Sequence, residues 1–129
     1  MPAFNFKPQF APLVESGKKT QTIRRTKRGN VGDTAYLKIG QRTKKCRALG
    51  EGILTEVSEI SIDESEVGIN GVYYFSKTVI DRPFLDKFAR ADGFSDFLEM
   101  KTWFDNQYGL PFSGWLHVWK LKGEVKDVN

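Results

Sequence analysis

The segment that most constrains the fold is a long strand-like run at residues 46–62, CRALGEGILTEVSEISI. Side chains of a strand alternate between its two faces, so a strand shows a period of two. The β-branched residues change phase along this run: Ile53, Thr55 and Val57 share one phase, and Ile60 and Ile62 share the other. A bulge or bend near Ser58 would reconcile the two phases, as expected where a sheet curls into a barrel.

Four shorter strands are expected around this run. Strand-like alternation at residues 20–25 is followed by the turn residues of RGNVGD and by a second strand at 35–39. After an acidic loop, DESEVG, the Asn-Gly pair at residues 70 and 71 is typical of a hairpin turn and predicts a short strand. The segment 115–121, WLHVWKL, predicts a closing strand.

Three helices complete the expected set. Apolar spacing at residues 10–14 predicts about two turns ended by Gly17, and a second helix is expected at 84–91 after a proline. Ser95 suits the N-cap of a third helix. One face of that helix is expected to pack in the core: Phe97, Met100, Phe104 and Tyr108. The order of elements predicts an α+β fold, a small curled β-barrel with flanking helices.

Length and composition predict one domain covering residues 1–129. Apolar residues make up 40% of the chain and aromatic residues 13%, which is enough for one core, while 129 residues are too few for two ordinary domains. The first residues, MPAFNFKPQF, contain no apolar signal region, and no apolar run approaches the length that crosses a bilayer. We therefore expect a monomeric cytoplasmic protein without membrane contact.

Basic residues are concentrated in one part of the sequence. Between Lys18 and Lys45 there are ten lysines and arginines and a single acid, whereas residues 51–66 carry six acids and no base. The net charge is +4. Two interpretations stay open: the basic residues form a solvated face, or they bind a polyanion. Folding decides between them, because it can gather these charges on one surface or scatter them.

No metal site and no cofactor are expected. Cys46 is the one cysteine and His117 the one histidine, so neither an intrachain disulfide nor a Cys/His zinc site can form. Cys46 is expected to be a small apolar core residue. His117, in the closing strand, is expected to be structural.

The segment SGKKTQTIRR at residues 16–25 resembles a nucleotide-triphosphate loop only superficially. That motif requires glycine where Pro12 stands and serine or threonine where Lys19 stands. The sequence therefore excludes a phosphate loop of this type.

The same segment nevertheless brings reactive residue types together. In a strand, Thr20, Thr22 and Arg24 point to one face, and Lys19 can reach that face from the preceding turn. A threonine hydroxyl becomes a nucleophile when a base takes its proton, and lysine can be that base when burial or a neighbouring cation lowers its pKa. The alternative is an ordinary strand with β-branched threonines and solvated charges.

Several motifs resemble the ASCH domain family of the PUA-like superfamily. They are FAPLVESGKKTQTIRR, VGDTAYL, FARADGFSDFLEM, FDNQYG and the final apolar strand, and the likeness covers almost the whole chain. Its most specific part is Gly-x-Lys-Thr-x-Thr-x-Arg with a later Gly-Asp. ARADGF and YGLPF further resemble compact stand-alone members, including phage-encoded ones. The resemblance implies a small β-barrel related to the PUA fold.

The resemblance also implies binding of RNA, another nucleic acid or a nucleotide-like ligand in a basic cleft. The residues expected to contact this ligand are Lys18, Thr20, Arg24, Arg25 and Arg28. Lys27, Lys44 and Lys45 are further candidates for phosphate contacts. Tyr73, Tyr74 and Trp115 could stack on bases, although filling the core is the more ordinary role of such residues.

An enzymatic alternative comes from one stand-alone branch of the family, an amidohydrolase that removes the acetyl group from acetylcytidine with a lysine, a threonine and a glutamate. By motif, the lysine matches Lys19, the threonine matches Thr22, and the acid falls on Asp92, one methylene shorter. Lys19 would act as base on Thr22, whose oxygen attacks the acyl carbon, with Asp92 orienting the lysine or carrying the proton and Arg24 stabilising the oxyanion. Asp-Gly pairs also end many helices, so a structural Asp92 is the competing interpretation.

Overall fold

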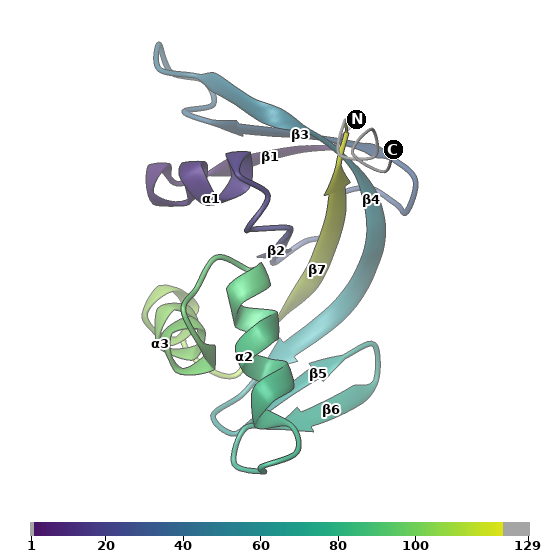
Figure 1. The fold of residues 1–129 in the computed structure, drawn as a ribbon, viewed down its shortest axis with the longest axis vertical. Coiled ribbons are helices and arrows are strands. Elements are labelled where there is room, and N and C mark those ends of the chain that lie inside the picture. Colours follow the sequence, from purple (N-terminus) through teal and green to yellow (C-terminus); the bar gives the residue numbers. More distant parts are fainter. Residues whose placement is uncertain (1, 123–129) are drawn as a thin grey trace.

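The long strand-like run forms one strand, β4 (Arg47–Ile62), that organises the sheet (Figure 1). β4 pairs antiparallel with β3 (Thr34–Ile39) over its first part, with β5 (Glu66–Ile69) at its end, and with β7 (Phe112–Leu121) along most of its length. The register against β7 shifts between Leu54 and Glu56. The bend expected near Ser58 is therefore a bulge at Thr55.

The computed structural model describes residues 2–122, and the ends of the expected domain, residues 1 and 123–129, lie outside the described residues. Seven strands form one curled sheet. β1 (Ala3–Phe6) pairs parallel with β3, β6 (Val72–Phe75) pairs with β5, and β2 (Gln21–Arg24) pairs with β7. The sheet path leaves β1 and β2 without strand pairing to each other. We call this interruption the β1–β2 seam.

Helices cover one side of the curled sheet. The short 3-10 turn η1 (Pro8–Phe10) leads into α1 (Ala11–Glu15) near β1, while α2 (Arg82–Ala91) and α3 (Phe97–Tyr108) pack together below it (Figure 1). The mixed α+β class and the curled sheet agree with the sequence prediction.

The start of α3 corrects one prediction. Asp96, and not Ser95, is the N-cap, because Asp96 has an extended backbone and its side chain accepts a hydrogen bond from the Glu99 main-chain nitrogen at 2.9 Å. The Ser95 main-chain nitrogen donates to Glu99 Oε1 at 2.7 Å, so the two acids close the first turn together.

Four further predictions were wrong or incomplete. Tyr108, expected on the core face of α3, is 42% exposed at the last residue of that helix. β1 was not predicted at all, and part of the acidic loop is the strand β5, which forms a hairpin with β6 through a turn in which Asn70 and Gly71 have positive φ. Cys46 is exposed instead of buried. It lies at the end of the β3–β4 loop, which extends away from the core (Figure 1).

Candidate functional site

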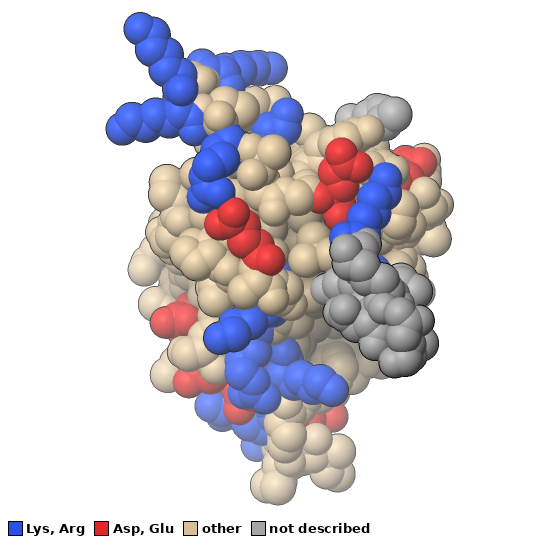
Figure 2. All heavy atoms as spheres, turned by 45° about the horizontal axis from the view of Figure 1, so that its top comes forward, with Lys and Arg blue, Asp and Glu red and all other residues tan. Residues whose placement is uncertain are grey.

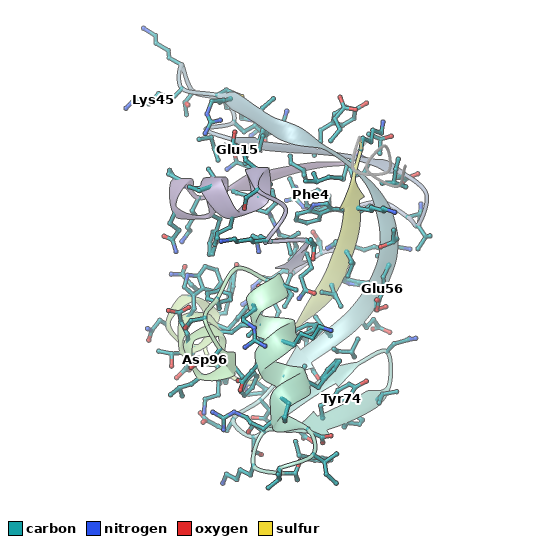
Figure 3. The ribbon with its side chains drawn as sticks, viewed as in Figure 1. Phe4, Glu15, Lys45, Glu56, Tyr74 and Asp96 are labelled. Carbon is teal, nitrogen blue, oxygen red and sulfur yellow. The ribbon has the colours of Figure 1, made fainter. Side chains whose placement is uncertain are left out.

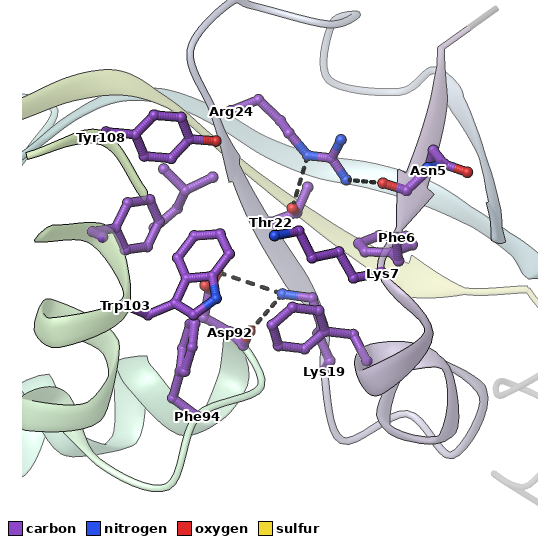
Figure 4. Close-up of a pocket in the computed structure, with 13 residues that line it drawn as sticks. Asn5, Phe6, Lys7, Lys19, Thr22, Arg24, Asp92, Phe94, Trp103 and Tyr108 are labelled. Atoms are coloured by element: carbon purple, nitrogen blue, oxygen red, sulfur yellow. Dashed lines mark hydrogen bonds and ion pairs between the residues drawn. The ribbon is translucent and has the colours of Figure 1, made fainter. Parts of the chain in front are cut away.

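A pocket of about 130 Å³ lies at the β1–β2 seam (Figure 4). Its walls come from four parts of the chain: β1 with the residues after it, β2 with the turn before it, the α2–α3 connection, and α3. The lining residues used below are Asn5, Phe6, Lys7, Phe10, Lys19, Thr22, Arg24, Asp92, Phe94, Trp103 and Tyr108. The pocket thus brings together Lys19, Thr22, Arg24 and Asp92, four residues that the sequence singled out.

Lys19 is held at the pocket floor by its own backbone. Its main-chain nitrogen donates to the Leu13 carbonyl at 2.9 Å, which fixes the turn between α1 and β2. The side chain is only 3% exposed, and Nζ donates to the Asp92 main-chain oxygen at 2.5 Å. Burial lowers the pKa of Lys19 to about 8. The negative charge of Asp92 raises this pKa, and the positive charge of Arg24 lowers it by a smaller amount. Lys19 is therefore a cation that can lose its proton near neutral pH.

Asp92 is the partner of Lys19 at the end of α2. Its Oδ1 lies 3.8 Å from Lys19 Nζ and accepts a hydrogen bond from Gln21 Nε2 at 3.3 Å. Burial raises the pKa of Asp92 to about 6, while Lys19 and the Gln21 hydrogen bond act in the opposite direction. Gly93 follows with φ of 100°, and a Cβ there would lie 3.2 Å from Lys19 Cδ. The Asp-Gly pair thus both ends the helix and faces the lysine, so the two interpretations of Asp92 are compatible.

Thr22 and Arg24 share one face of β2, as the period of a strand predicts. Arg24 Nε donates to Thr22 Oγ1 at 3.0 Å, and Arg24 Nη2 donates across the seam to the Asn5 carbonyl at 3.0 Å. The guanidinium also lies over Phe6, 5.2 Å from the ring centroid. Burial lowers the pKa of Arg24 to about 10, so it is still a cation at neutral pH. No hydrogen bond joins Lys19 Nζ to Thr22 Oγ1 among the described residues.

Aromatic rings form the wall opposite Arg24. Phe94 and Trp103 lie with their ring centroids 5.7 Å apart, and Phe10 packs against both. Lys7 Nζ lies 5.3 Å from the Trp103 ring centroid, and Lys19 Nζ lies 5.0 Å from that of Phe10. The pocket therefore combines apolar ring surfaces with buried donors.

The other predicted ligand residues lie outside the pocket lining. Lys18 is exposed, and the Thr20 main chain bonds to Ala91 and Trp119. Arg25 is exposed, and its guanidinium lies 4.8 Å from the ring centroid of Tyr108, which lines the pocket. Arg28 is exposed beside β1, and its Nη1 donates to the Ala3 carbonyl at 3.3 Å.

The candidate stacking residues do not line the pocket. Tyr73 is 56% exposed, and Tyr74 stacks on Phe84 at 4.3 Å between centroids, at the far end of the molecule (Figure 3). Trp115 is half-buried, with Lys27 Nζ 5.7 Å from its ring centroid. The ring surfaces of the site instead come from residues that the sequence prediction had not assigned to it. For Phe6, the Phe-Asn-Phe alternation was the available signal; for Trp103, there was none.

His117 is fully buried in β7 and has a positioning role. Its Nε2 accepts a hydrogen bond from the Arg28 main-chain nitrogen at 2.9 Å. Burial lowers the pKa of His117 to about 4, so at neutral pH it is uncharged and Nε2 can accept this bond. The structural role expected for His117 thus includes fixing the loop that carries Arg28.

Basic side chains are not spread evenly over the surface. Figure 2 shows lysine and arginine side chains projecting from the tip of the β3–β4 hairpin, with few acids beside them. The exposed basic residues of this hairpin are Arg42, Lys44, Lys45 and Arg47, and Arg47 is paired with Glu15 at 2.7 Å.

Searches with family models, of curated proteins and of solved structures find no match to this chain. Within residues 2–122, no group of three or more His, Cys, Asp and Glu residues is arranged to hold a metal ion. None of the helices in the same range has the length and apolar character needed to cross a membrane.

Proposed function

We propose that this chain is a monomeric ASCH-type domain of the PUA-like superfamily that binds RNA, or a related nucleotide ligand, at the β1–β2 seam. The observation that carries the proposal is the convergence of Lys19, Thr22, Arg24 and Asp92 on one small pocket with aromatic walls. Pockets for whole drug-sized ligands measure about 300–1,000 Å³. A pocket of about 130 Å³ matches one ring of such a ligand, as a nucleobase would be.

The chemistry of the walls supports a base as the bound group. Single-stranded nucleic acids are recognised through unstacked bases that lie on aromatic rings and hydrogen-bond through their edges. Trp103 and Phe94 provide ring surface, while Arg24 and Lys19 provide donors and Asp92 an acceptor. Arg25, exposed next to Tyr108 of the pocket lining, can contact a phosphate.

The binding experiment is fluorescence anisotropy with short single- and double-stranded RNA and DNA, titrated from about 50 to 200 mM salt. Binding should weaken with salt, and Arg25→Gln should reduce the salt dependence by about one phosphate contact. Trp103→Ala should weaken binding of single strands by roughly 1–3 kcal/mol without changing the salt slope. No binding at low salt would refute nucleic-acid binding.

A second candidate, hydrolysis of an acylated nucleoside such as acetylcytidine, is favoured by the buried Lys19 with its pKa of about 8. In this reaction Lys19 takes the Thr22 hydroxyl proton, and Thr22 Oγ1 bonds to the acyl carbon. The proton passes to the departing nucleobase nitrogen, and water then hydrolyses the threonine ester to release the acid. Arg24, which donates to Thr22 Oγ1, is placed to stabilise developing negative charge. Lys19 Nζ must first leave the Asp92 carbonyl and approach Thr22.

The test of this second candidate is release of acetate from acetylcytidine. Lys19→Ala should abolish turnover by orders of magnitude, and Thr22→Val, which keeps the side-chain shape, should do the same. Turnover that survives both substitutions would refute the mechanism. If the wild type shows no turnover and the Thr22→Val variant still binds nucleic acid, only the first function remains.

A further inference from the structure

A second hollow lies beside β1. It is open to solvent, has a volume of about 310 Å³, and is lined by Asn5, Arg28, Gln41 and Arg42. Two of these four side chains are guanidinium groups, and none is a carboxylate. The hollow therefore has the charge and the donors of an anion site.

The hollow and the pocket share Asn5. The Asn5 main-chain oxygen accepts from Arg24 Nη2 at 3.0 Å on the pocket side (Figure 4). The Asn5 side-chain Oδ1 accepts from the Gln41 main-chain nitrogen at 2.8 Å, in the loop that carries Arg42. A single residue thus lines both sites, so the pocket and the hollow are neighbours.

The two arginines of the hollow are held by their backbones. Arg28 is fixed at its main-chain nitrogen by the buried His117. Arg42 has φ of 67°, a left-handed conformation that glycine adopts freely and that costs a side-chain-bearing residue roughly 1–2 kcal/mol. Backbone strain of this kind is a reason to look for a functional role. An arginine at a turn position suited to glycine places a cation at the hollow despite that cost.

We propose that this hollow is a phosphate subsite, so that the ligand is a nucleotide whose ring occupies the pocket and whose phosphate lies between Arg28 and Arg42. The phosphate subsite rests on the proposed binding function and specifies its ligand as a nucleotide. A free nucleoside would leave the subsite empty, because it has no phosphate. Arginine forms paired, charge-assisted hydrogen bonds with phosphate oxygens. The phosphate can belong to a mononucleotide or to a strand.

The β3–β4 hairpin offers a matched control. Lys45, at its tip, projects away from the body of the protein (Figure 3) and does not line the hollow. Lys45→Ala and Arg42→Gly each remove one positive charge from this loop, but only Arg42 lines the hollow. Arg42→Gly also relieves the left-handed backbone, so its Tm should equal or exceed that of the wild type.

The experiment measures Kd by isothermal titration for the four ribonucleosides, their 5′- and 3′-monophosphates, and single-stranded RNA trinucleotides. For the preferred base, a monophosphate should bind the wild type about tenfold more tightly than the nucleoside. Arg42→Gly should reduce this ratio to near one and leave the nucleoside affinity unchanged, whereas Lys45→Ala should keep the ratio. A trinucleotide that binds no better than the monophosphate identifies a free nucleotide as ligand, and one that binds better identifies a strand.

Two results would overturn the phosphate subsite in different ways. Equal affinity of nucleoside and monophosphate for the wild type, or equal ratios in the Arg42→Gly and Lys45→Ala variants, would refute the subsite and leave the pocket function standing. Absence of binding by all the nucleosides, nucleotides and trinucleotides would refute both the subsite and nucleotide binding at the seam.

Discussion

Replacing Asp92 by asparagine should change the protonation of Lys19 at neutral pH. Asparagine keeps the shape of aspartate and an Oδ1 that can accept from Gln21, so the substitution removes mainly the charge. The two charged atoms are 3.8 Å apart. With an effective dielectric constant of about 20, Coulomb's law gives an attraction of about 4 kcal/mol, which corresponds to a change of about 3 in pKa.

The pKa of Lys19 should therefore fall from about 8 to about 5 in Asp92→Asn. At pH 7 the wild-type amine is about nine-tenths protonated, whereas the variant amine is almost entirely neutral. If Lys19 is the base of a hydrolytic reaction, the acid limb of its pH profile should move from about pH 8 to about pH 5 in the variant. If Lys19 serves as a cation for binding, affinity for an anionic ligand should drop at pH 7.

The direct assay is the ¹³Cε chemical shift of lysine followed by NMR from about pH 4 to pH 11. Arg24→Gln is the control of opposite sign, because the Arg24 charge lowers the pKa of Lys19 and its removal should raise that pKa. A Lys19 midpoint in Asp92→Asn that stays near 8, or moves toward 10.5, would refute the electrostatic account of this pair.

Three further predictions concern stability, measured as the free energy of unfolding in urea. Between pH 8 and 10.5 the wild type should gain stability relative to Lys19→Met, because unfolded Lys19 still binds a proton that the folded protein has lost; a constant difference would contradict this. Gly114→Ala should cost roughly 1–3 kcal/mol, since its Cβ would press on the main-chain oxygen of Arg24, and an unchanged midpoint would count against this packing. Asp96→Ala should cost about 1 kcal/mol and Ser95→Ala only a few tenths, and the reverse order would restore Ser95 as the cap.

Local sequence signals predicted the elements that carry them strongly. The alternation in β4, the Asn-Gly turn and the apolar face of α3 each lie within one short segment, so local signals were sufficient. On that face Phe97, Met100 and Phe104 are buried, whereas Tyr108 is not. β1 has only four residues and pairs in parallel with a strand about thirty residues later, and its short alternation gave too little signal. β5 was hidden because acids precede it and one of its two buried residues is a glycine, so it shows little apolar pattern.

Within the candidate site, too, local sequence signals predicted some relations between residues and not others. The common face of Thr22 and Arg24 follows from the period of a strand, and their hydrogen bond agrees with it. Lys19 and Asp92 are 73 positions apart, and no periodicity connects them. Only the family resemblance placed Asp92 near the lysine. Burial shifts both pKa values, and it depends on residues from separate segments: Lys19 Nζ lies 5.7 Å from the Phe6 ring centroid and 5.0 Å from that of Phe10. These residues become neighbours of Asp92 only when the chain has folded.

The pairing of β2 also sets the order in which the protein can mature. β2 carries Thr22 and Arg24, and its one strand partner is β7, at the other end of the described chain. During synthesis, β2 must wait for β7 to emerge from the ribosome before its ladder can form, and contacts of such long sequence separation form slowly. A nascent chain that stops before Phe112 therefore has no ordered seam. If the seam binds a ligand as proposed, binding reports completed folding, because the seam requires the first and last thirds of the sequence to have met.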